Sequence, residues 1–324
     1  MQVRVYKHQP FARCDTCHSL DEQISLSGRD SLGLAWKLKT LHLEYVASCR
    51  AAMLERAHFA RAHRVCPHPD WVLYINADGM DQQKTNIPNP HEKTKGGEKG
   101  LPVTTKLLGA IAYGRRWYGF WSFPQWGATA NLTLTALCHI IREVQREERE
   151  RGGQLPRKLQ LQMDNSGRDN KNHYLLGFAG QLLSEGLFDE VEVYFLPVGH
   201  THNKIDGTFS RVAHAIAKAG ALSMPELMER ARTAWSGTHA QVGTDAKSNV
   251  LLEHVLDFRR ALRYGRDRLQ EVGPPVLHSF SGLGTERGGG AAAGGGPRRF
   301  GTARPPPQLQ CLPHAHKQCW VRVA

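Results

Sequence analysis

The sequence contains no long apolar run. Its hydrophobic stretches fall well short of the roughly 18 residues that a membrane-spanning helix needs. The amino-terminal sequence, Met1-Gln-Val-Arg-Val-Tyr-Lys-His, also lacks the apolar core of a signal peptide. We therefore expect a soluble intracellular protein that has neither a transmembrane segment nor a signal peptide.

Cysteine is sparse. Seven cysteines are scattered through 324 residues, and an odd, dispersed set does not suggest a disulfide framework. Cys14-x-x-Cys17 is the one pair with metal-ligand spacing, which makes it a candidate for a structural zinc site. Zinc would need two further ligands. They could come from Cys66 with His68, or from Cys49 with His42, once the intervening helical segment folds back.

Acidic residues are outnumbered by basic ones. The chain has 42 Lys and Arg against 30 Asp and Glu, a formal net charge of +12, which suits a polyanionic partner such as nucleic acid. Residues 257–324 alone hold eleven Lys or Arg against four Asp or Glu. Runs of glycine and proline at residues 288–296 and 305–307 cannot bury enough apolar surface to fold. We therefore expect a disordered basic tail.

Two segments that the sequence predicts to be strands each end in an aspartate. The clearest apolar segment, residues 71–77, runs directly into Asp78. An alternating segment, residues 158–163, has its apolar side chains on one face and ends at Asp164. Either acid alone would be an ordinary turn residue, because Asp and Asn bond their own backbone at such places.

The third acid follows two histidines. Residues 191–196 alternate as a strand, and Val-Gly-His-Thr-His-Asn-Lys-Ile-Asp follows at residues 198–206. An apolar stripe with helical spacing begins there: Ile205, Phe209, Val212 and Ile216. His200 and His202 could position water or phosphate, or serve as ligands beside Asp206. Three element ends that each deliver an acid favour one shared site over three separate turns.

Carboxylates gathered from separate elements have a known use. Hard oxygen ligands hold Mg or Mn ions and leave positions for water and substrate phosphate. Two such ions can activate the attacking oxygen and stabilise the leaving one in phosphodiester cleavage or strand transfer. We therefore predict Asp78, Asp164 and Asp206 as catalytic ligands of a two-ion site, with His200 and His202 assisting. A first acid on the opening strand, a second after a later strand and a third on a helix is the layout of an RNase H-like integrase or transposase core.

Three motifs occur in this order. They are Asp-Gly-Met-Asp-Gln-Gln-Lys-Thr-Asn from Asp78, Leu-Gln-Met-Asp-Asn around Asp164 with a following Asp-Asn-Lys-Asn, and Val-Gly-His-Thr-His-Asn-Lys-Ile-Asp up to Asp206. Together they resemble an uncharacterised domain family that is abundant in transposon-rich eukaryotic genomes, over about residues 11–235. The resemblance implies a transposon-derived RNase H-like protein, a transposase-like nuclease in the nucleus that binds nucleic acid, with DNA favoured, and can form homo-oligomers. Asp206 stands where transposases usually carry Glu.

The expected architecture is an α/β layer fold. We predict a helical amino-terminal region with the Cys-x-x-Cys pair over residues 1–70, an RNase H-like core with a mixed sheet and flanking helices over 71–235, a basic helical extension over 236–272 and the low-complexity tail over 273–324. Residues 31–64 predict one long helix or a helical hairpin. The aromatic segment 116–122 is expected in the sheet core rather than as a base-stacking platform.

Two other functions stay open. The same fold could survive as a non-catalytic nucleic-acid-binding or scaffold protein. A Gly-His-Thr-His string also ends the motif series of calcineurin-like metallophosphoesterases, but those enzymes need an early Asp-x-His and a later Gly-Asn-His. Here the first strand leads into Asp78-Gly79-Met80 and no Gly-Asn-His occurs, which counts against that class.

Overall fold

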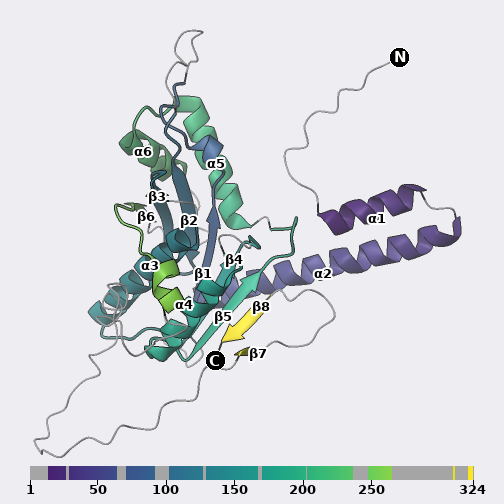
Figure 1. Cartoon of the computed structure of the whole chain (residues 1–324), viewed down its shortest axis with the longest axis horizontal. Coiled ribbons are helices and arrows are strands. Elements are labelled where there is room, and N and C mark those ends of the chain that lie inside the picture. The colour runs from purple at the N-terminus through teal and green to yellow at the C-terminus, as the bar shows by residue number, and fades with distance from the viewer. Residues whose placement is uncertain are drawn as a thin grey trace, which may run out of the picture.

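The protein is an α/β structure in which helices cover both faces of a mixed sheet, as a computed structural model shows (Figure 1). The structure describes residues 14–26, 29–63, 71–91, 102–126, 129–166, 170–201, 203–235, 247–264, 309–310 and 320–323. Within these ranges, no helix is both long enough and apolar enough to cross a membrane.

The described ranges contain the following helices and strands. The helices are α1 (Asp15–Leu26), α2 (Arg29–Ala62), α3 (Ala130–Glu150), α4 (His173–Ser184), α5 (Lys204–Ala219), α6 (Met224–Ala234) and α8 (Phe258–Tyr264), with a short 3-10 turn η1 (Gln82–Lys84). The strands are β1 (Val72–Gly79), β2 (Lys106–Ala112), β3 (Arg116–Ser122), β4 (Lys158–Met163), β5 (Glu190–Phe195), β6 (Lys247–Leu251), β7 (Leu309–Gln310) and β8 (Trp320–Val323).

These strands form one sheet in the order β6-β3-β2-β1-β4-β5-β8-β7. β1, β2 and β3 form an antiparallel meander, whereas β4 and β5 run parallel to β1. The parallel arrangement brings the carboxyl ends of β1, β4 and β5 to the same edge of the sheet. In α/β folds this is the edge at which ligands usually bind.

A hydrophobic core lies on each face of the sheet. On one face, residues such as Leu73 and Leu161 pack under α3 and α4. On the other face, residues such as Tyr74 and Leu107 pack against α5, α6 and the second half of α2. The aromatic side chains of β3 are buried, which confirms the prediction that they belong to the sheet core: Trp117, Tyr118, Phe120 and Trp121.

The amino-terminal region is helical, as predicted. α1 packs along α2, which is a single helix of 34 residues rather than a hairpin. The later turns of α2 reach the sheet through Met53, Ala57 and Ala60, while its earlier turns extend past the sheet together with α1 (Figure 1). Leu34 and Trp36, on this outer part, are more than half exposed.

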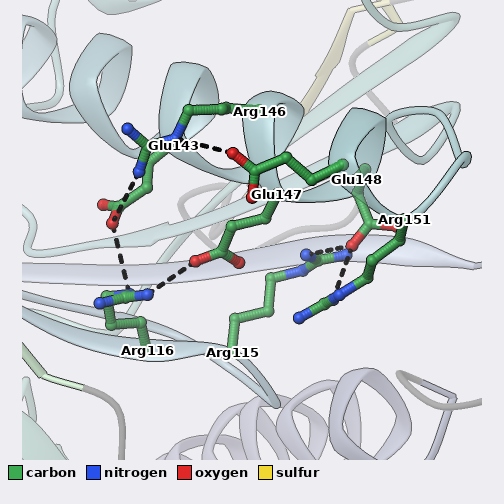
Figure 2. Close-up of polar contacts among 8 residues, drawn as sticks. Arg115, Arg116, Glu143, Arg146, Glu147, Glu148 and Arg151 are labelled. Carbon is green, nitrogen blue, oxygen red and sulfur yellow. Dashed lines mark hydrogen bonds and ion pairs between the residues drawn. The ribbon is translucent and has the colours of Figure 1, made fainter.

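Ion pairs bind the turn between β2 and β3 to α3 (Figure 2). Arg115 donates to Glu148 at 2.7 Å, and Arg151 approaches the same carboxylate at 3.2 Å. Arg115 is only 2% exposed, so this pair is almost completely removed from solvent. A buried arginine without its carboxylate would be costly, and the packing of α3 on this turn therefore depends on the pair.

The predicted helical extension over residues 236–272 needs correction. β6 lies within it and adds in parallel to β3, so that the sheet extends past residue 235 and α8 is the described helix of this segment. Val250 packs on one core and Leu251 on the other, as alternation requires. The edge of β3 offers backbone hydrogen bonds to residues 247–251, whereas residues 258–264 form the helix α8.

Part of the predicted disordered tail also forms strands. β8 pairs antiparallel with β5, and β7 pairs with β8. The sequence of β8, Trp-Val-Arg-Val, alternates as a strand does, unlike the glycine and proline runs before it. Those runs, at residues 288–296 and 305–307, lie outside the described residues.

Candidate functional site

Asp78 and Asp164 lie at the same edge of the sheet. Asp78 is near the end of β1, and Asp164 directly follows β4. The parallel register pairs Asn76 with Gln162, so each acid stands two positions beyond a paired residue. Because neighbouring strands are about 4.8 Å apart, this register sets the two acids beside each other.

Strand alternation directs both acids toward the same face. Ala77 and Met163, which immediately precede them, belong to the core under α3 and α4. Successive side chains of a strand point to opposite faces. Asp78 and Asp164 therefore face the side of the sheet that α5 covers.

The start of α5 brings Asp206 to this place. The side-chain oxygen of Asn203 accepts the backbone N–H of Ile205 at 2.6 Å, and Oδ2 of Asp206 accepts the backbone N–H of Asn203 at 2.7 Å, which completes a capping box. The side-chain amide of Asn203 donates to Oδ2 of Asp78 at 3.3 Å. Asn203 therefore links the first acid to the third.

A glycine in β2 permits the close approach of α5. Gly109 pairs with Asp78 in the antiparallel register. A Cβ at this position would lie 2.8 Å from the ring of Phe209 and 3.0 Å from Ile205, both on the buried face of α5. A side chain at position 109 would displace the side chains of Phe209 and Ile205, which belong to the same helix as Asp206.

The charge of the cluster acts on Asp78. Burial raises the pKa of this carboxyl most, and the negative charges of Asp206 and then Asp164 raise it further, to about 7. Hydrogen bonds from the backbone N–H of Gly79, at 2.8 Å, and from Asn203 lower the pKa in part. Both other carboxylates thus lie close enough to repel the charge of Asp78, and a cation placed between them would relieve this repulsion.

Two asparagines hold the loop after β4. Asn170 donates from Nδ2 to Oδ1 of Asp164. Asn165 donates from Nδ2 to the backbone oxygen of Leu196, beyond the end of β5, at 3.1 Å. These bonds fix the second acid against the neighbouring strand.

His200 joins a different group. Its Nε2 lies 3.4 Å from Sγ of Cys17 and 3.3 Å from Nε2 of His42, which in turn lies 3.4 Å from Sγ of Cys14. We predicted His200 as a helper of Asp206 because the two are close in sequence. The structure places its ring with the predicted zinc pair instead.

The other predicted ligands have separate outcomes. Of the predicted pair Cys49 and His42, only His42 belongs to the group with Cys14 and Cys17. Cys66, His68 and His202 lie outside the described residues. The assisting role of His202 stays a prediction.

The two candidate sites differ in compactness. Within the described ranges, the Cys/His group is the one set of three or more metal-ligand side chains whose ligand atoms all lie within 4.8 Å of one another. The three aspartates do not form such a set. A pocket beside Arg56, Trp71 and Lys158 lies toward the opposite ends of β1 and β4 and contains none of the predicted site residues.

Asn203 and Asn170 are site residues that the sequence analysis missed. A signal for Asn203 was available, because an Asn followed three residues later by an acid, at the start of an apolar helical stripe, is a capping signature. No comparable signal marks Asn170. It lies six residues beyond Asp164, outside any helix or strand whose periodicity could predict the contact.

The family of the chain follows from its match to known domains. The Domain of unknown function (DUF7869) matches residues 95–281. The chain belongs to the DUF7869 family. The matched part of this DUF7869 protein includes Asp164, His200 and Asp206, whereas Asp78 and Cys14 precede it. No curated protein and no solved structure matches the chain. The predicted membership of an uncharacterised domain family is thus confirmed, and its transposon origin stays a proposal.

Proposed function

We propose that this DUF7869 protein is a metal-dependent phosphoryl-transfer enzyme with an RNase H-like core of transposon origin. It cleaves or joins phosphodiester bonds in nucleic acid, with DNA as the favoured substrate. The observation that carries the proposal is the position of Asn203, which ties Asp78 on β1 to Asp206 on α5. The register of β1 and β4 adds Asp164 to the same place.

The three acids fit a hard divalent cation. All of the donors are carboxylate oxygens, which Mg and Mn prefer as ligands. The negative charges of Asp206 and Asp164 repel the charge of Asp78, which is half-buried, and a bound cation would neutralise this repulsion. When bound, such ions supply Lewis acidity and an activated oxygen nucleophile for phosphodiester chemistry.

The chain's own residues orient these oxygens. Asn203 holds Oδ2 of Asp78, and Asn170 holds Oδ1 of Asp164. Asp206 is held by the cap of α5. Ligands that are already oriented by neighbouring hydrogen bonds bind metal with less loss of freedom, which supports a metal role for this cluster.

Basic residues at the start of α5 and near the end of α2 suit a phosphate backbone. Lys204 opens α5, and its pKa is lowered by burial and by the positive charge of Arg61 near the end of α2. Two cations held near each other favour a bound anion. The net charge of +12 agrees with a polyanionic substrate. The succession of β1, β4 and α5, each with one acid, supports the RNase H-like assignment.

A non-catalytic role on nucleic acid is the second candidate. The observation that favours it is the capping box of α5, because this box by itself accounts for an acid at position 206. Asp78 and Asp164 would then be strand-end turn residues. Such a protein would bind nucleic acid or act as a scaffold without cleaving it.

The test uses the full chain with labelled duplex DNA, single-stranded DNA and RNA, in Mg, in Mn and in chelator. Metal-dependent cleavage or joining is expected, and it should fall more than about 100-fold in Asp164→Asn, because even outer-shell changes at metal sites cost 10–100-fold. Asp189→Asn is the matched control. Asp189 pairs with Arg157 next to the amino ends of β4 and β5, and the variant should keep wild-type activity.

Two results separate the candidates. Absence of metal-dependent cleavage on all three substrates, together with no measurable Mn binding by calorimetry, rejects the enzyme. Retained binding of nucleic acid in the same preparation would then favour the non-catalytic role.

A further inference from the structure

Four metal-ligand side chains from three parts of the chain converge on one point. Cys14 precedes α1, Cys17 lies in its first turn, His42 lies within α2, and His200 follows β5. Their ligand atoms all lie within 4.8 Å of one another. Cys14 is buried and the other three are partly buried, so the group is largely withdrawn from solvent.

The separations match the edges of a tetrahedron around zinc. With Zn–S near 2.3 Å and Zn–N near 2.0 Å, tetrahedral edges are about 3.3 Å between two nitrogens and about 3.5 Å between sulfur and nitrogen. The two Nε2 atoms are 3.3 Å apart, and each lies 3.4 Å from a cysteine Sγ. A neutral imidazole nitrogen donates one proton or accepts one, yet each Nε2 faces both a sulfur and the other ring nitrogen. One shared cation satisfies all of these contacts together.

The backbone is shaped for this convergence. Gly199, immediately before His200, has φ +76°, a conformation that favours glycine. A Cβ on Gly199 would lie 2.5 Å from Cα of Cys14, so a side chain cannot be placed there without moving the start of α1. Arg50 of α2 also reaches the backbone oxygen of His200, at 3.5 Å. The loop after β5 and the α1–α2 pair are therefore in close contact at this point.

We propose that Cys14, Cys17, His42 and His200 bind a structural zinc ion that fastens the α1–α2 pair to the loop between β5 and α5. Four protein ligands leave no open position, which is the character of a structural zinc site rather than a catalytic one. Zinc binding at this group does not depend on the proposed nuclease activity. It has a consequence for that activity, however, because the loop held through His200 continues into Asn203, which contacts Asp78.

Metal content of the full chain is the direct test. Protein prepared with zinc is expected to retain one zinc ion per chain after gel filtration, measured by plasma mass spectrometry. Cobalt(II) in its place should show the ligand-field and sulfur-to-metal absorption of a tetrahedral site. Cys17→Ser and His200→Ala should lose the metal. His42→Cys should keep it, because a thiolate can replace the imidazole as a ligand.

Matched controls come from the same two helices. His18→Ala changes an exposed histidine next to Cys17, and Cys49→Ser changes a cysteine of α2 outside the group; both should retain zinc. Circular dichroism shows whether each variant folds. Where a ligand variant does not fold, thiol modification of the wild-type protein decides the matter, because it should release zinc to a chromogenic chelator in a one-to-one ratio.

The proposal is overturned if wild-type protein incubated with zinc retains none, or if it contains a Cys14–Cys17 disulfide in place of metal. Zinc retained by His200→Ala at the wild-type level would overturn it as well. Asp164→Asn separates this proposal from the nuclease, since that variant should keep its zinc while losing cleavage. Zinc present in a wild-type protein that cleaves nothing would reject the nuclease alone.

Discussion

The side-chain amide of Asn203 donates a hydrogen bond to Oδ2 of Asp78 at 3.3 Å, joining positions 125 residues apart. The same residue caps α5 and holds Asp206 through its backbone N–H. The cap of α5 and the contact with Asp78 therefore both depend on the side chain of Asn203. Suitable substitutions can separate these two roles.

Asn203→Ala removes both roles. It should lower the free energy of unfolding by about 1 kcal/mol, the usual cost of a lost cap, and any metal-dependent activity by about 10–100-fold. Asn203→Ser keeps an oxygen for the cap but has no amide for Asp78, so activity should fall while stability stays close to wild type. Urea denaturation and the cleavage assay measure the two effects. Wild-type activity in both variants would show that the contact with Asp78 has no functional role.

The raised pKa of Asp78 makes stability depend on pH. An Asp ionises near pH 3.9 in an unfolded chain, whereas Asp78 does so at about 7 in the folded protein. Between these values the folded state holds a proton that the unfolded state has lost, so stability falls as the pH rises through this window. Above pH 7 the whole loss of stability is present.

Asp78→Asn removes this cost. Its free energy of unfolding should match wild type below about pH 4 and exceed it above about pH 7, by up to a few kcal/mol at about 1.4 kcal/mol per pKa unit. Urea denaturation across this range gives the difference. A difference in stability that does not change with pH would contradict a raised pKa of Asp78. Asp206→Asn removes the larger of the two repelling charges, so the loss of stability caused by Asp78 should occur at lower pH in that variant.

Metal binding should be coupled to the same proton. A cation at the acids needs Asp78 ionised, so affinity for Mn should fall about tenfold for each pH unit below 7 and level off above it. Calorimetry in buffers of different ionisation enthalpy should register about one proton released per binding event near pH 6. Asp78→Asn should bind more weakly and release no proton. An affinity that is independent of pH would remove Asp78 from the set of ligands.

A pair of glycines tests the packing behind the site. Gly119 on β3 faces the buried ring of Trp235, and a Cβ there would lie 2.2 Å from a ring carbon. Gly119→Ala should therefore destabilise the protein by about 1–3 kcal/mol or more through overpacking. Gly180→Ala is the control, because nothing lies within 4 Å of its Cβ position in α4. It should stabilise the helix by about 0.5–1 kcal/mol in the same denaturation experiment.

The buried ion pair of Figure 2 makes a separate prediction for stability. Glu148→Ala leaves the 2% exposed Arg115 without its carboxylate and should cost about 3–5 kcal/mol. Glu150→Ala, on the exposed side of α3, loses a pair with Arg146 in which both side chains are well exposed. That change should stay within about 0.5 kcal/mol. Equal losses of unfolding free energy in the two variants would show that burial does not determine how much an ion pair contributes to stability.

Local patterns were sufficient to predict most elements. The alternation of residues 158–163 corresponds to β4, and the helical spacing from residue 205 corresponds to α5. Side-chain periodicity is a property of neighbouring residues, so it can be recognised without the fold. The positions of Asp78 and Asp164 at strand ends followed from the same patterns. The strand in residues 247–251 was missed because its local composition is mixed, and pairing with β3 decides its conformation.

The partners of the reactive side chains depend on the fold. His200 is close to Asp206 in sequence, but its ring meets His42, 158 positions away. Gly199 turns the chain there toward the start of α1, and no periodic pattern encodes such a turn. The sequence by itself determined which elements form and which side chains carry chemistry, because both follow from residue types and their local spacing. Only the tertiary structure decided which of these side chains share a site, because that depends on strand register and on the backbone of the connecting loops.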